Sequence, residues 1–145
     1  MEVTIREIDV NTDRIEYLNL LKQLTHLDVD SITPEAYLAQ LKHIRSNPNH
    51  LIYLAEIEGK IVGSITLLIE PKFIRNLSQV AHIEDVVVDS NCRQHGVGRK
   101  LVEYVLAKSQ ELGCYKTILD CSEKNAGFYS KFGFSLKEQQ MALYH

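Results

Sequence analysis

Two adjacent carboxylates, Glu84 and Asp85, interrupt a segment that otherwise resembles a buried β-strand, residues 80–89. Successive side chains of a strand point to opposite faces of its sheet. If helices cover both faces, at least one of these carboxylates is buried, and a buried carboxylate without a partner is costly. Two explanations remain open. The acids belong to an ion pair or a fraying strand end, or a β-bulge turns both toward a functional cleft.

The segment Arg93–Gly98, which follows this strand and opens a predicted helix, has the composition of an anion-binding loop. Backbone N–H groups at a helix start bind phosphate, and glycine lets the phosphate approach closely. Arg93 and Arg99 add positive charge. The loop lacks both the Gly-x-Gly-x-x-Gly of dinucleotide-binding folds and the Gly-Lys-Ser/Thr of nucleoside-triphosphate loops. An anion site and an ordinary loop-to-helix turn both remain open.

Composition limits the classes of function. The chain has 145 residues, 45% of them hydrophobic, a formal net charge of −3 and a pI near 6.1. These values predict one globular domain, residues 1–145, and argue against nucleic acid as the main partner. No apolar run has the length of a membrane helix, and no signal-peptide pattern is present. The three cysteines, Cys92, Cys114 and Cys121, lack metal-ligand spacing and are expected to be reduced thiols with no metal.

The elements that must position these residues follow from hydrophobic periodicity and turn signals. We expect strands over 3–8, 80–89 and 115–121, and a hairpin over 50–70 that turns at Glu58-Gly59-Lys60. Helices are expected over 13–24, from Thr33 and Pro34 onward, over 96–112 and over 125–132, with Gly113 as a C-cap. The tail from Phe134 could form a last strand. The order β-α-α-β-β-β-α-β-α-β predicts an α/β mixed sheet with helices on both faces.

Several other polar residues have both a structural and a functional interpretation. Tyr129 lies between Phe128 and Phe132, which favours a core position. Asp120 is placed to cap a turn after a strand, and Lys72 and Arg75 could lie in a solvated loop after Pro71. His82 is better explained as a hydrogen-bonded core residue than as a base. Cys121 has no partner motif of a catalytic cysteine.

The motif Arg93-x-x-Gly96-x-Gly98 after a mixed strand resembles the pyrophosphate-binding loop of the GNAT acetyltransferases. The stretches "HIEDVVVDSNCRQHGVGRKLVE", "ELGCYKTILDCSEKNAGFYSKFGF" and "LKQLTHLDVDSITPEAY" extend the similarity to the glucosamine 6-phosphate N-acetyltransferase family. This resemblance implies the GNAT fold, with a mostly antiparallel twisted sheet. It also implies acetyl transfer from acetyl-CoA to the 2-amino group of glucosamine 6-phosphate, by direct attack in a ternary complex, in UDP-N-acetylglucosamine synthesis. Because that pathway is usually cytosolic, the resemblance implies a cytoplasmic location, and an organellar location also stays open.

The resemblance also implies roles for individual residues. Glu84, Asp85 and Asp120 would hold the amine and help remove its proton, and Tyr129 would donate a hydrogen bond or proton to the departing thiolate. The residues implied in cofactor binding are Val86, Val87, Val88, Arg93, Gln94, His95, Gly96, Val97, Gly98, Arg99, Asn125 and Tyr129. The residues implied in sugar-phosphate binding are Thr25, Lys72, Arg75, Glu84, Asp85, Tyr115 and Lys116.

The chain departs from the family's pattern at its C-terminus. The family has a basic residue there that reaches the sugar phosphate, whereas this chain ends Met-Ala-Leu-Tyr144-His145. An arginine can hold phosphate with two hydrogen bonds, which Tyr or His cannot reproduce. The resemblance further implies a homodimer with its sugar site near the interface. Two alternatives remain: a GNAT enzyme for another small amine, and a non-catalytic acyl-CoA-binding module.

Overall fold

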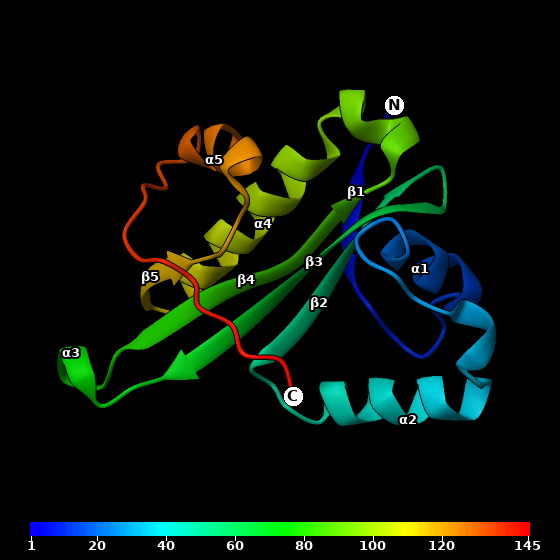
Figure 1. The fold of residues 1–145 in the computed structure, drawn as a ribbon, viewed down its shortest axis with the longest axis horizontal. Coiled ribbons are helices and arrows are strands. Elements are labelled where there is room, and N and C mark those ends of the chain that lie inside the picture. Colours follow the sequence, from blue (N-terminus) through cyan, green and yellow to red (C-terminus); the bar gives the residue numbers. More distant parts are fainter.

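The computed structural model describes residues 1–145, whose strands form one mixed sheet in the order β1-β2-β3-β4-β5 (Figure 1). The strands are β1 (Thr4–Glu7), β2 (His50–Ile57), β3 (Lys60–Pro71), β4 (Gln79–Val88) and β5 (Cys114–Ile118). The first four pair antiparallel in turn, and β5 runs parallel to β4. This confirms the mixed sheet that the order of elements predicts and the mostly antiparallel pairing that the family resemblance implies.

Helices cover both faces of the sheet, as predicted (Figure 1). They are α1 (Arg14–Leu21), α2 (Pro34–Arg45), α3 (Ile74–Leu77), α4 (Val97–Glu111) and α5 (Glu123–Ser130), with 3-10 turns η1 (Val29–Ser31) and η2 (Ser90–His95). One buried cluster joins the sheet to α4 and α5 and includes Leu67, Leu101 and Tyr129. A second cluster joins the opposite face to α1 and α2 and includes Tyr17 and Leu41. We refer to these as the α4 face and the α1/α2 face.

Local sequence signals explain where most elements begin and end. Thr33 caps α2, since its hydroxyl accepts a hydrogen bond from the Ala36 N–H at 3.1 Å, and Pro34 follows at the first helical position. The β2–β3 hairpin turns at Glu58 and Gly59, both with positive φ. Gly113, with φ of 78°, ends α4. None of the helices is long and apolar enough to cross a membrane.

The predicted strand after Phe134 is not formed in this chain. Residues 135–145 contain no helix or strand, and Leu136, Met141, Leu143 and Tyr144 are between 78% and 94% exposed. A strand needs a neighbour to pair its N–H and C=O groups, and none lies along this segment. The prediction was therefore wrong for a single chain. Residues 119–121, predicted as strand, and 131–132, predicted as helix, also lie outside the observed elements.

Gly63 on β3 allows α4 to lie close to the sheet. A Cβ built there would come within 2.8 Å of Val97 Cγ1 and 2.9 Å of Leu101 Cδ1, both from fully buried side chains of α4. We expect Gly63→Ala to lower the free energy of unfolding by about 1–3 kcal/mol, because the core around Val97 cannot absorb another methyl group without strain. Urea denaturation of the purified variant measures this change.

Gly127→Ala is the matched control for that prediction. Gly127 is exposed in α5, and a Cβ there would meet nothing within 4 Å. Alanine in a helix is more stable than glycine by roughly 0.5–1 kcal/mol, so this variant should unfold at higher urea concentration. A Gly63→Ala protein as stable as the unmodified chain would show that α4 does not need the missing side chain.

Candidate active site

A β-bulge on β4 contains the two acids, as one of the sequence-based explanations proposed. Thr66 of β3 pairs with Glu84, but Ser64, two residues away, pairs with Val87, so β4 carries one extra residue between these pairs. Asp85 has the left-handed φ of 48°, which is uncommon for a residue with a side chain. The bulge therefore shifts the register at the acids.

The register shift exchanges the faces of the strand. Ala81 and Ile83 pack in the cluster of the α4 face, whereas Val87, an even number of residues later, packs in the cluster of the α1/α2 face. Val86 and Val88 then turn toward the α4 face. In a regular strand Ile83 and Val87 would share a face. Glu84, which alternates with Ile83, is thus directed to the α1/α2 face next to the exposed Asp85.

The edge of β4 beyond the acids has no neighbouring strand. β4 pairs with β5 only from Gln79 to His82, whose partner is Ile118, and β5 ends there while β4 continues to Val88. Backbone N–H and C=O groups along this part of the edge are free to bond an extended ligand that carries amide groups. The pantetheine arm of coenzyme A is a ligand of this kind. Val86, Val87 and Val88, implied in cofactor binding, all belong to this edge.

The N-terminus of α4 lies directly after this edge and forms the second part of the site. The phosphate loop, which we define as residues 90–98, contains the turn η2 and the first residues of α4. Gly96 has φ of 71° and precedes the first helical residue, Val97, so the N–H groups of the first helical turn have no partner within the helix. A fifteen-residue helix begins there. Its dipole favours a negatively charged group at this end, which fits a diphosphate.

The side chains in and next to the phosphate loop differ in their exposure and in whether they already have a partner. Arg93 and Gln94 are exposed, and His95 is half-buried. Arg99 forms an ion pair with Glu103, Nε to Oε1 at 2.7 Å, so it would have to leave that carboxylate to reach a ligand. Gly98 lies between two elements of the site, since a Cβ there would be 3.4 Å from Phe128 of α5 and 3.6 Å from Val88 of β4. The loop thus joins the ends of β4, α4 and α5.

The acid-bearing bulge also has the electrostatics of a proton-transfer site. Burial raises the pKa of Glu84 above its ordinary value, and the negative charges of Asp85 and Asp120 raise it further. His82 acts in the opposite direction. Its Nε2 lies 3.0 Å from Glu70 Oε1, and Lys72 pairs with the same oxygen at 3.3 Å. His82 is therefore hydrogen-bonded, as predicted, but it is half-buried beside the acids rather than part of the core.

These charges predict how the pH dependence of the reaction responds to mutation. If ionised Glu84 takes up the proton of the amine, activity falls as the pH drops through the pKa of Glu84. His82→Gln removes the group that lowers this pKa, so the acid limb of kcat/KM should move to higher pH. Asp120→Asn removes a charge that raises it, so the limb should move to lower pH.

The pH–rate profiles of the unmodified protein and of both variants measure these shifts. The ionisation of the substrate amine affects all three profiles equally, so it does not change the comparison. Asp85, which also raises the pKa of Glu84, is unchanged in both variants. Shifts in the same direction for the two variants would show that Glu84 does not set the acid limb.

Tyr129 is 9% exposed and packs edge-to-face against Phe128 and Phe134, with ring centroids 5.0 and 6.0 Å away. Burial, and to a lesser degree Cys121, raises its pKa, so the phenol stays protonated at neutral pH and can donate a hydrogen bond. The buried position confirms the structural interpretation, and the protonated phenol is compatible with the functional one, which stays a prediction. Asn125 lies one turn earlier on α5 and is exposed, and Asp120 is exposed between β5 and α5.

Three of the residues implied in sugar-phosphate binding form a basic cluster at the far end of β4. Two cations lie near the ring of Tyr115, with Arg75 Cζ and Lys116 Nζ each 5.6 Å from its centroid. Arg75, Asn76 and Leu77 of α3 all have left-handed φ, which costs roughly 1 kcal/mol for each such residue. Neither Arg75 nor Lys116 has a carboxylate partner. Two unpaired cations beside one ring suit a phosphate. Lys72 is instead paired with Glu70.

Thr25 is separated from this cluster within one chain. Lys116 pairs with Val80, near the start of β4, whereas Gln23, two residues before Thr25, bonds Ser90 just beyond the end of β4. Ten strand residues span roughly 30 Å, and a hexose phosphate is only about as long as three of them, ~10 Å. A single protomer therefore does not bring Thr25 and the basic cluster to one sugar phosphate.

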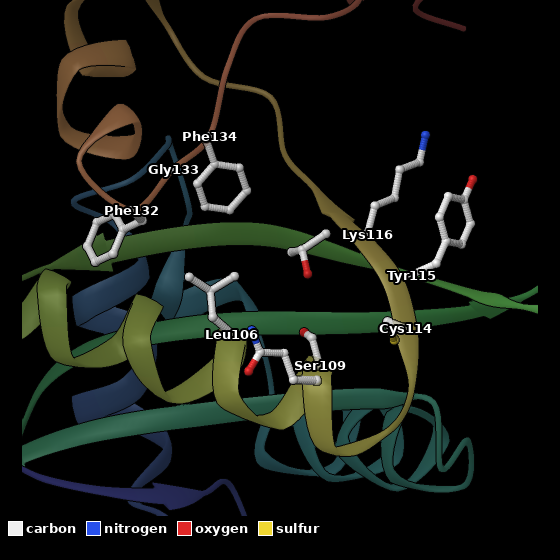
Figure 2. Close-up of a pocket in the computed structure, with 10 residues that line it drawn as sticks. Leu106, Ser109, Cys114, Tyr115, Lys116, Phe132, Gly133 and Phe134 are labelled. Carbon is white, nitrogen blue, oxygen red and sulfur yellow. The ribbon is translucent and has the colours of Figure 1, made fainter.

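A cavity of about 310 Å³ lies beside β5, between the C-terminal half of α4 and residues 132–134 (Figure 2). Leu106 and Ser109 of α4 and Phe132 and Phe134 line it, and Tyr115 and Lys116 project from β5 at its rim. It does not include Glu84, Asp85 or Tyr129. All three cysteines are free thiols, as expected.

Sequence reasoning missed two residues that shape the site. Gly63 allows the close approach of α4, and its only signal is a glycine within an apolar strand, which marks either a bulge or close packing. Gln23 accepts a hydrogen bond from the Ser90 N–H at 2.9 Å, across 67 residues of sequence, and no local pattern indicates that contact.

Both the sequence and the fold of this chain are similar to those of known acetyltransferases. The model of the Acetyltransferase (GNAT) family matches residues 16–134. Glucosamine 6-phosphate N-acetyltransferase of Arabidopsis thaliana is 42% identical over 143 residues, which are 97% of this chain and 95% of that protein. The enzyme of the same name from Trypanosoma brucei brucei is 41% identical over 91% of this chain and 89% of its own. The crystal structure of the Arabidopsis enzyme superposes with a TM-score of 0.93, at 41% identity and 99% coverage of both chains.

Proposed function

Because the chain belongs to the GNAT acetyltransferase family, we propose that it transfers the acetyl group of acetyl-CoA to the 2-amino group of glucosamine 6-phosphate. The products are N-acetylglucosamine 6-phosphate and free coenzyme A. The structural observation that supports acyl transfer is the order of three features along one strand. The acids of the bulge, the unpaired edge of β4 and the N-terminus of α4 follow one another beyond His82, where β5 ends.

The two faces of the sheet suit two substrates that meet at the bulge. Acetyl-CoA supplies an activated acyl group, and its diphosphate would lie on the N–H groups around Gly96 and Gly98. The pantetheine arm would pair with the edge of β4, where a backbone N–H can polarise the thioester carbonyl. Glu84 and Asp85 would receive the amine from the α1/α2 face. Holding both substrates in this way supplies much of the rate enhancement through proximity.

Proton transfer is assigned to the side chains nearest the bulge. The amine attacks as a neutral base, so its ammonium form must lose a proton before bond formation, and the new amide nitrogen loses another. Glu84, with Asp120 beside it, has the raised pKa of a group that can accept such a proton. Tyr129, protonated because burial raises its pKa, would donate to the departing thiolate. Asn125 lies one turn before Tyr129 on α5 and therefore on the same face of that helix.

The phosphate of the sugar is assigned to the cluster of Arg75, Tyr115 and Lys116. This cluster offers two cations without a carboxylate partner, which supports it as the binding site of the sugar phosphate. Lys72 would contribute only after leaving Glu70. The assignment distinguishes a phosphorylated amino sugar from an uncharged one.

We further propose that the protein is a homodimer whose sugar site contains residues of both protomers. Two observations support this. Thr25 and the basic cluster are too far apart within one chain to share a ligand. The tail after Phe134 also exposes several large apolar side chains and pairs with no strand, while the outer edge of β5 has no partner either.

Analytical ultracentrifugation of the full chain and of a variant that lacks residues 136–145 tests the dimer. We expect a dimer for the full chain, and for the shortened chain a monomer that still binds coenzyme A but does not turn over glucosamine 6-phosphate. A full chain that sediments as a monomer at micromolar concentration would contradict the proposal.

A substrate panel tests the reaction itself. Acetyl-CoA is mixed with glucosamine 6-phosphate, glucosamine, spermidine or a lysine peptide, and release of free thiol is followed. The highest kcat/KM is expected for glucosamine 6-phosphate. Thiol release only with another amine would contradict the proposed substrate and indicate a GNAT enzyme for that amine. No thiol release with any of the amines would favour the non-catalytic acyl-CoA-binding module. The place in UDP-N-acetylglucosamine synthesis and the cytoplasmic location stay predictions.

A further inference from the structure

One hydrogen bond joins the two sides of the site. The loop between α1 and η1, residues 22–28, carries Thr25, and the phosphate loop, residues 90–98, begins at Ser90. Gln23 Oε1 accepts the Ser90 N–H at 2.9 Å. The backbone N–H groups of residues 22–25 bond only to carbonyls of α1, so they do not attach this loop to the sheet. The Gln23 side chain is the only hydrogen bond from residues 22–28 to the phosphate loop.

Because of the position of Ser90, this hydrogen bond holds the start of the phosphate loop. Ser90 is the first residue of η2, directly after Asp89, whose N–H is fixed to Val62 O at 2.8 Å and whose carboxylate accepts the Asn91 N–H at 2.9 Å. The first turn of the phosphate loop is thus tied to β3 on one side and to Gln23 on the other. A diphosphate bound at Gly96–Gly98 would order the loop from its other end.

We propose that Gln23 is a positioning residue that couples the two substrate sites, which rests on the function proposed above. By holding the α1–η1 loop against the start of the phosphate loop, it makes the ordering of either loop favour the ordering of the other. Coenzyme A and glucosamine 6-phosphate then strengthen each other's binding by the same factor, because coupling between two sites is reciprocal. Gln23 touches neither ligand.

The expected size of the coupling follows from the strength of one exposed hydrogen bond. Such a bond corresponds to roughly a 2- to 10-fold change in an equilibrium constant. We therefore expect glucosamine 6-phosphate to lower the Kd of coenzyme A by a factor in this range. Coenzyme A replaces acetyl-CoA in the measurement so that no reaction occurs, and isothermal titration gives the Kd with and without the sugar phosphate.

Three variants separate the hydrogen bond from other effects. Gln23→Met keeps the length of the side chain but removes the acceptor, so the ratio of the two Kd values should fall to one. Gln23→Glu keeps an oxygen acceptor and should restore the coupling. Ser90→Pro removes the N–H donor at the first position of a 3-10 turn, together with the serine hydroxyl, and Asp89 before it has a φ and ψ that tolerate a following proline. It should behave like Gln23→Met.

The double variant Gln23→Met with Ser90→Pro should lose no more coupling than either single variant, because both remove the same bond. Ser90→Ala, which keeps the N–H, should retain the coupling. For each variant, the ratio compares the Kd of coenzyme A with and without the sugar phosphate in the same protein. A general loss of affinity or stability therefore cancels from the ratio.

The outcomes distinguish this inference from the function on which it rests. Binding of both ligands to the unmodified protein with no change in the Kd of coenzyme A would overturn the inference alone. The same holds if Gln23→Met retains the full ratio. If the unmodified protein does not bind glucosamine 6-phosphate, the proposed function fails and the inference fails with it.

Discussion

Replacement of Tyr129 by Phe is expected to lower kcat about 100-fold while the KM for acetyl-CoA changes less than about twofold. The substitution removes the only donor that this residue can offer to the departing thiolate. The ring stays, so the edge-to-face packing against Phe128 and Phe134 is kept and the fold should be unchanged. Because the effect falls on the transition state rather than on bound cofactor, kcat should respond and KM should not. Steady-state kinetics with glucosamine 6-phosphate measure both constants.

Tyr104→Phe is a matched control for this substitution. Tyr104 lies on α4, packs edge-to-face against Tyr53 at 4.9 Å and is 41% exposed, so it loses the same hydroxyl away from the site. Its kinetics should match those of the unmodified protein. If Tyr129→Phe also retains normal turnover, the tyrosine is a core residue only and the leaving group is protonated by water.

The second large effect is expected at the basic cluster. Arg75→Ala combined with Lys116→Ala should raise the KM for glucosamine 6-phosphate by about 100-fold or more, since each charge-assisted contact to phosphate contributes about 1.5–3 kcal/mol. The affinity for acetyl-CoA should be unchanged, because the cluster lies at the other end of β4 from the phosphate loop. Kinetics and titration with each ligand separate the two constants.

Unphosphorylated glucosamine provides the internal control for the cluster. It lacks the group that the two cations would bind, so its kcat/KM should be the same in the double variant and in the unmodified protein. Lys60→Ala, at the exposed β2–β3 turn, removes a cation elsewhere and should leave both substrates unaffected. Equal losses for glucosamine and its phosphate would mean that the cluster serves the fold, not the phosphate.

Much of the architecture could be predicted from the sequence because its signals are local. The Thr33-Pro34 cap, the Glu58-Gly59 turn and the Gly113 helix end depend on backbone preferences of a few neighbouring residues, and all are confirmed. The apolar periodicity of 96–112 predicted a helix in the same way, and α4 confirms it, although Tyr104 and Leu112 of the expected apolar stripe are exposed. The anion-binding composition of the phosphate loop is equally local, since a glycine before a helix start offers free N–H groups wherever it occurs.

The chemistry of the acids required the tertiary structure. The sequence left open whether Glu84 and Asp85 form an ion pair or line a cleft, because alternation along a strand predicts opposite faces for neighbours. The answer depends on how β4 pairs with β3 and on where its pairing with β5 ends. Register and strand divergence arise from contacts between segments distant in sequence, so no local pattern encodes them. The same reason explains why Gly63 and Gln23 were missed.

By itself, then, the sequence determined the secondary elements, the helix start that suits a diphosphate and the residue types available for proton transfer, because these follow from short-range propensity and composition. Only the tertiary structure decided which of these residues meet. It joined Glu84 to Asp120 and His82, gathered Arg75, Tyr115 and Lys116 around one ring, and separated Thr25 from them. These distances are set by sheet register and helix packing, which balance contributions from the whole chain and cannot be read from any one segment.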